Sequence, residues 1–144
     1  MSTDAIRPSI RQRVDVIRSS DLPLQFQESG LLTLRAETTN MDESLYVQEN
    51  VDFISDIMAN RNIEAAALER LQQPDKAIAL YEANLKDRFK GLLPYERLRV
   101  LYSSAGKYRD AIRVCQAYLE HGEDDEDRKT RFREWIAMFE HRHE

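Results

Sequence analysis

Side chains able to act as nucleophiles or as soft metal ligands are scarce in this chain. It contains one cysteine, Cys115, and three histidines, at positions 121, 141 and 143. A metal site needs several such ligands together, and His141 and His143 stand two positions apart at a predicted helix end, so their rings should point in different directions. Cys115 lies in an apolar helical pattern, where a buried structural cysteine is favoured over a nucleophile. With no phosphate-binding glycine loop and no nucleophile elbow, we predict a protein that is not an enzyme and needs no metal or cofactor.

Two charged stretches could instead contact a partner. The predicted helix over residues 7–19 carries four arginines on its outer face, namely Arg7, Arg11, Arg13 and Arg18. They could follow a phosphate backbone, but a solvated helix surface is the favoured interpretation, since a net charge of −5 opposes binding to nucleic acid. The acidic run at 123–127 precedes another predicted helix, whose N-terminus favours negative charge, and it lacks the spacing of a calcium loop.

The composition is typical of a helix-rich protein with one main domain. Of the 144 residues, 42% are hydrophobic and 33% are charged, and no apolar run is long enough to span a bilayer. The first residues lack the apolar core of a signal peptide, and a single cysteine cannot form an internal disulfide. We therefore expect a cytoplasmic protein that does not enter the membrane.

The N-terminal third contains one clear helix and one ambiguous segment. Apolar residues recur at helical spacing over 7–19, which predicts a short amphipathic helix. In 21–39 the apolar residues alternate on both sides of Gly30, which allows a small β-hairpin, but 31–37 could equally be a helical turn. A further helix is predicted from about 41 to 59, and the polar residues 60–62 either end it or are passed through.

The strongest pattern lies in residues 93–119, which read as two antiparallel helices. Pro94 suits the first turn of the leading helix, Gly106 suits the left-handed residue that ends it, and Ala111 is a small residue at the packing point of the second. The pattern of the second helix also occurs 34 positions earlier, with Ala77 at the position of Ala111 and Leu85 at that of Leu119. The chain therefore contains an internal repeat.

A helix-turn-helix recurring about every 34 residues resembles the tetratricopeptide repeat family. In residues 58–120, the positions that fit the family motif are Ala65, Leu68, Ala77, Tyr81, Tyr95, Leu98, Tyr102 and Ala111. Motif positions of the second repeat that depart from it hold Arg99, Cys115 and Glu123, and Arg61 and Glu64 depart in the first.

The resemblance implies a mainly α-helical, short solenoid of antiparallel helix pairs. Residues 1–40 would form an N-terminal region and 41–144 the helical domain, with repeats at about 58–91 and 92–125. A helix at about 126–142 would cap the array with an apolar face made of Phe132, Trp135, Ile136 and Phe139.

Members of this family bind peptides in a groove lined by the leading helix of each repeat. The resemblance places the following residues in that groove: Asn62, Glu69, Arg70, Glu96, Arg97, Val100, Ser103 and Ser104. The chaperone-binding subgroup carries asparagine where this chain has Ala66 and Val100, so its carboxylate-binding activity is not expected. We expect an adaptor or scaffold that binds a protein or peptide. The alternatives are a nucleic-acid-associated regulator that uses the arginine face, and a protein that assembles with itself as a homodimer or larger homo-oligomer.

Overall fold

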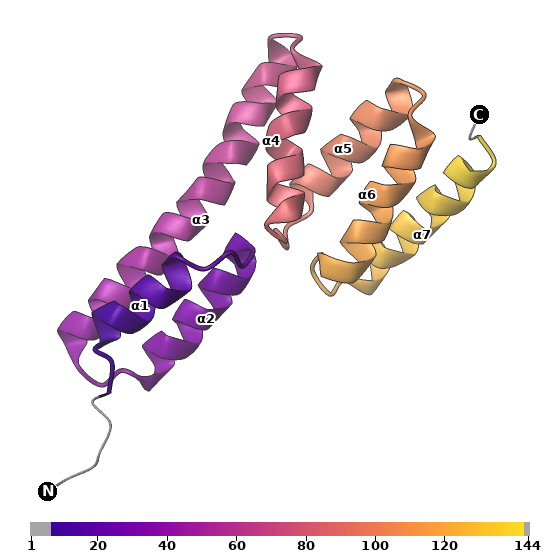
Figure 1. The fold of residues 1–144 in the computed structure, drawn as a ribbon. Coiled ribbons are helices and arrows are strands. Elements are labelled where there is room, and N and C mark those ends of the chain that lie inside the picture. Colours follow the sequence, from indigo (N-terminus) through magenta and orange to yellow (C-terminus); the bar gives the residue numbers. More distant parts are fainter. Residues whose placement is uncertain (1–6, 143–144) are drawn as a thin grey trace, which may run out of the picture. The chain divides into compact units, whose positions relative to one another are not determined.

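The computed structural model describes residues 7–142, and all the regular elements within this range are helices (Figure 1). His143 lies outside it. The helices are α1 (Ile10–Arg18), α2 (Leu24–Glu37), α3 (Met41–Arg70), α4 (Pro74–Lys86), α5 (Leu93–Ser104), α6 (Tyr108–His121) and α7 (Glu126–Glu140). The prediction of a mainly helical protein is confirmed for this range. None of these helices is both long enough and apolar enough to cross a membrane.

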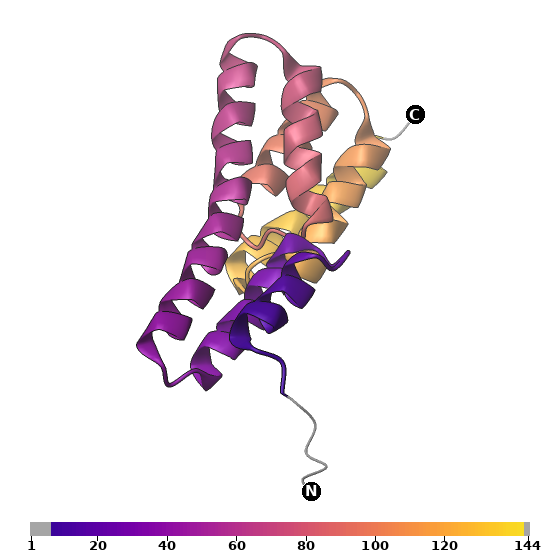
Figure 2. The ribbon, with the colours of Figure 1, turned by 60° about the vertical axis from the view of Figure 1, so that its left-hand side comes forward.

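Two compact units divide the chain between residues 56 and 57, within α3. Figure 2 shows α3 as one uninterrupted helix, so the polar residues at 60–62 are passed through and do not end it. The first unit contains α1, α2 and the start of α3. The second contains the end of α3 and all of α4 to α7.

The hairpin alternative for residues 21–39 is wrong, because this segment forms α2. Gln27, Leu31 and Leu34 recur at helical spacing and are all buried in the first unit. The buried Gln27 amide donates a hydrogen bond of 2.9 Å to the carbonyl of Leu22 and accepts one of 3.0 Å from Arg18. These bonds stabilise the connection between α1 and α2, and they compensate for burying a polar side chain.

Gly30, predicted as a turn residue, lies inside α2. A Cβ atom at this position would meet Ile17 Cδ1 of α1 at 3.6 Å, an ordinary van der Waals distance. We therefore expect Gly30→Ala to raise the free energy of unfolding by about 0.5–1 kcal/mol, since glycine is a poor residue in a helix interior. Urea unfolding measures this.

Gly106 provides the control for this substitution. Its φ of +75° is left-handed, as predicted from its place after α5. Gly106→Ala should lower the free energy of unfolding by about 1 kcal/mol, because the added Cβ is strained there. A loss of stability on Gly30→Ala would mean that the contact between α1 and α2 is tighter than described.

In the second unit, consecutive helices pack antiparallel. Asn84 of α4 donates to Asn62 and Tyr81 donates to Glu69, so the later residue of α4 meets the earlier residue of α3. In the same way, α6 runs back along α5, and α7 runs back along α6. Their contacts are the ring pairs Tyr95–Tyr118, Tyr118–Phe132 and Tyr108–Phe139, with centroids 5.3, 4.3 and 5.8 Å apart.

Small residues and tyrosines fill the core of this unit. Ala77 and Ala111, the repeated alanines, are completely buried, as are Tyr81, Tyr95 and Tyr118. A small side chain lets neighbouring helices approach closely, and the large rings then fill the space around it. Of the four residues in the apolar face predicted for the last helix, Phe132 and Phe139 are 1% exposed, and Trp135 and Ile136 are half-buried against the same core.

Candidate functional site

Cys115 lies in the core and is not positioned to act as a nucleophile. It is completely buried, and burial raises the pKa of its thiol to about 12. The reactive thiolate is therefore negligible at neutral pH. Within residues 7–142 no three histidine, cysteine or acidic side chains come together as metal ligands would.

Three of the four arginines predicted for a phosphate-binding face are engaged within the first unit. Arg11 lies 4.2 Å over the ring of Tyr46, and Arg13 forms an ion pair of 3.0 Å with Glu37. Arg18 donates to Gln27, as described above, while Arg7 is exposed. This arrangement therefore does not offer nucleic acid a continuous row of free guanidinium groups.

Glu69 and Arg97, both predicted to line the groove, pair with each other. Arg97 Nη2 lies 2.5 Å from Glu69 Oε1, and the hydroxyl of Tyr81 donates to Glu69 Oε2 at 2.7 Å. Burial alone would raise the pKa of Glu69, but the hydrogen bonds from Arg97 and Tyr81 outweigh it and the pKa is lowered. The ionised carboxylate thus joins α3, α4 and α5.

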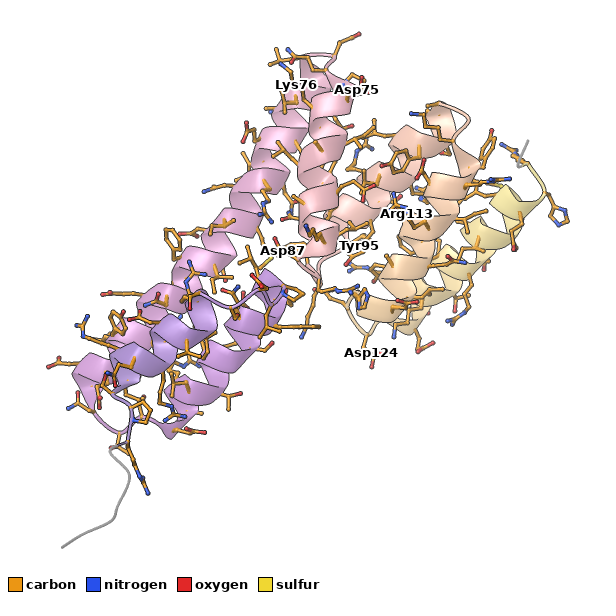
Figure 3. All side chains as sticks on the ribbon, in the orientation of Figure 1. Asp75, Lys76, Asp87, Tyr95, Arg113 and Asp124 are labelled. Carbon is orange, nitrogen blue, oxygen red and sulfur yellow. The ribbon has the colours of Figure 1, made fainter. Side chains whose placement is uncertain are left out.

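A second junction of the same composition lies one helix further along the chain. Arg113, labelled on α6 in Figure 3, forms an ion pair of 2.5 Å with Glu82 of α4. The hydroxyl of Tyr102, on α5, donates to the same carboxylate. Each junction uses a glutamate, a tyrosine from the next helix and an arginine from the helix after that.

The other predicted groove residues differ in their exposure. Asn62 is buried, and its side-chain carbonyl accepts a hydrogen bond of 2.8 Å from Asn84, so it belongs to the interior. Arg70 and Ser104 are exposed at the ends of their helices, and Val100 and Ser103 are half-buried. The Ser103 hydroxyl donates back to the carbonyl of Val100.

Glu96 lies at the edge of an open pocket between the first turns of α5 and α7. The pocket has a volume of about 400 Å³, and its lining residues are Leu92, Glu96, Asp125, Asp127, Arg128, Arg131 and Phe132. Leu92 and Phe132 supply its apolar part and the charged side chains its rim. One turn further along, α5 and α7 remain in contact, because the guanidinium of Arg99, which also pairs with Glu96, lies 4.0 Å over the ring of Trp135.

The rim of this pocket carries unpaired charges of both signs. Arg128 forms an ion pair of 3.1 Å with Glu123, but the side chains of Asp127 and Arg131 make no ion pair or hydrogen bond within the described chain. Asp127 belongs to the acidic run 123–127, whose favoured interpretation from sequence is charge at a helix N-terminus, and Arg131 was missed by sequence reasoning. Their signal is their position four apart on α7, beside the apolar face that was predicted.

Compared with protein-family models, curated proteins and solved structures, the chain matches none of them. The residues and their geometry therefore carry the functional argument.

His121, at the end of α6, lies in an environment that shifts its pKa. Its Nε2 contacts the guanidinium of Arg88, and a Glu120 carboxylate oxygen lies 3.4 Å from the same atom. Burial and the positive charge of Arg88 lower its pKa below the ordinary 6.5, although Glu120 acts in the opposite direction. The folded protein therefore resists protonation at this site more than the unfolded chain does.

This difference predicts a loss of stability in mild acid. The unfolded chain takes up the proton first, so the contribution of His121 is complete above pH 6.5 and falls as the pH drops from 6.5 toward the lower folded pKa. The free energy of unfolding, measured by urea titration across this range, should fall less in His121→Gln than in the wild type. If the free energy of unfolding fell equally with decreasing pH in both proteins, His121 would not be the source of the loss.

Proposed function

We propose that this chain is a non-enzymatic interaction module, an adaptor that binds a segment of another protein in the pocket between α5 and α7. The observation that carries the proposal is the combination of an apolar floor, made by Leu92 above the buried ring of Phe132, with the charges of Asp127 and Arg131 on the rim, which form no ion pair within residues 7–142. Protein interfaces have this organisation, with an apolar centre surrounded by polar groups. Arg131 is the residue we expect to contribute most, since arginine is enriched at energetic hot spots.

We further propose that α3 to α7 form an array similar to tetratricopeptide repeats. Support comes from contacts between every second helix, in addition to those between neighbours. Glu69 of α3 pairs with Arg97 of α5, Glu82 of α4 pairs with Arg113 of α6, and Arg99 of α5 stacks on Trp135 of α7. Regular contacts of this kind are expected where helical repeats stack on one another. The pocket would then lie between α5, the leading helix of the second repeat, and α7, the helix that follows this repeat.

Selection from a random peptide library displayed on phage, with the full chain as target, tests the binding proposal. Peptides recovered on the wild type should bind Arg131→Glu at least about tenfold more weakly, because an interface arginine is replaced by the opposite charge. The control is Arg133→Glu, which changes an exposed arginine on the other side of the same helix and should leave the affinity unchanged. Equal binding to all three proteins would contradict a role for the pocket.

A further inference from the structure

We propose that α7 is a self-association surface, through which two copies of the chain pair antiparallel about a two-fold axis. The surface is a row of side chains on α7, made of Asp127, Arg131, Glu134 and Met138. Their spacing of four, three and four residues places them along one face of the helix, as in the seam of a coiled coil. This proposal goes beyond binding in the pocket, and it shares Asp127 and Arg131 with that site.

The charges in this row differ from the other charges near the start of α7. Three basic residues outside the row pair within the chain, namely Arg128 with Glu123, Lys129 with Asp124 and Arg133 with Glu126. Asp127, Arg131 and Glu134 are exposed, and none of their side chains forms an ion pair or hydrogen bond within residues 7–142. The row thus keeps charges of both signs available for a second molecule.

A hollow lies in the row and supplies the apolar contact. It has a volume of about 360 Å³ and is lined by Arg131, Glu134, Trp135 and Met138. Trp135 is held in place from two sides, since its ring stacks on Phe139 with centroids 5.6 Å apart and lies under the guanidinium of Arg99. A partner would therefore meet a fixed aromatic surface between two charges of opposite sign.

The two central side chains of the row, Arg131 and Glu134, are complementary to each other when a second α7 lies antiparallel. The midpoint between 131 and 134 coincides with the midpoint between 127 and 138, so one two-fold axis relates both pairs of positions. Arg131 of each copy then faces Glu134 of the other, which gives two equivalent ion pairs, and Met138 faces Asp127. A two-fold interface requires this reciprocity. If a residue of one copy contacts a second position on the other copy, the same contact is repeated with the two copies exchanged. It is the reason for choosing a second copy over an unrelated protein.

Sedimentation equilibrium of the full chain tests the proposal through a charge exchange. The wild type should form dimers as its concentration rises. Glu134→Arg and Arg131→Glu should each weaken dimerisation at least about tenfold, because each places like charges opposite one another twice in the dimer. The double variant R131E/E134R exchanges the two charges, restores both ion pairs and should recover the dimer. Arg133→Glu, on the other side of α7, should dimerise as the wild type does.

The outcomes separate this proposal from the pocket. A wild type that remains monomeric up to about 1 mM overturns it, and so does a double variant as weak as the single ones. Because Glu134 does not line the pocket between α5 and α7, Glu134→Arg should lose the dimer without weakening the affinity for a selected peptide, whereas Arg131→Glu should weaken both. The substituted side chains are exposed, so circular dichroism should show the same helix content in all variants.

Discussion

Phe132→Ala is expected to lower the free energy of unfolding by about 3–5 kcal/mol, because it removes a fully buried ring and leaves a cavity. Phe132 is 1% exposed and stacks on Tyr118, whose ring in turn meets Tyr95 edge to face. The three rings join α5, α6 and α7. Their loss should therefore affect the whole second unit.

Trp135, the one tryptophan of the chain, lies one turn from Phe132 and can report unfolding by its fluorescence. The matched control is Phe26→Ala, since Phe26 is 48% exposed on α2 and its removal should change stability by no more than about 0.5 kcal/mol. If the two variants were equally stable, α7 would not pack on α6 as described.

Asn84→Asp is expected to destabilise the second unit by about 3 kcal/mol or more at neutral pH, because it buries a charge and removes two hydrogen-bond donors. Asn84 is completely buried in α4. Its amide donates 2.9 and 2.8 Å hydrogen bonds to the Met58 carbonyl and to Asn62, and its oxygen accepts one from Arg61. Aspartate would keep only the contact with Arg61 and would face two oxygens at short range.

Asn60→Asp on α3 is the control, since Asn60 is exposed and its replacement should change the free energy of unfolding by no more than about 0.5 kcal/mol. Urea unfolding of both variants gives the comparison. Part of the loss in Asn84→Asp should be recovered in acid, where the new carboxyl can take up a proton and donate again. A loss no larger than that of the control would mean that Asn84 does not join α3 to α4.

The helix boundaries that could be predicted are those set by local chemistry. Pro74 and Pro94 mark the starts of α4 and α5, and Gly106 marks the end of α5, because each of these residues restricts or frees the backbone at its own position. Periodicity placed α1 and α7 within a few residues of their observed bounds.

The errors and open alternatives arise where distant contacts outweigh local preference. Alternating apolar residues make 21–39 compatible with a hairpin, but a helix brings Gln27, Leu31 and Leu34 to one face, where all three are buried in the first unit, and this favours α2. The polar residues at 60–62 resemble a helix end. They continue the helix because Asn62 pairs with Asn84 of α4, and Arg61 lies 2.6 Å from Asp87, the residue that follows α4.

The candidate site could be predicted only in part. The resemblance indicated Glu69, Arg97 and Glu96 as surface residues of the groove, but it could not show that Glu69 and Arg97 pair with each other. The sequence predicts the last helix from its apolar face and from the acidic run before it. Asp127 and Arg131 lie beside that face, and their importance depends on α5 being close enough to form a pocket with them.

The most direct test of the proposed binding site is a titration of the ¹⁵N-labelled full chain with a peptide selected on it, followed by amide chemical shifts. We expect the largest changes at the residues that line the pocket on both helices, Leu92, Glu96, Asp127, Arg131 and Phe132. Amides of α1 and α2 should remain unchanged. Changes concentrated outside the pocket, with the amides of Glu96 and Arg131 unaffected, would contradict the proposal that α5 and α7 together form the binding site.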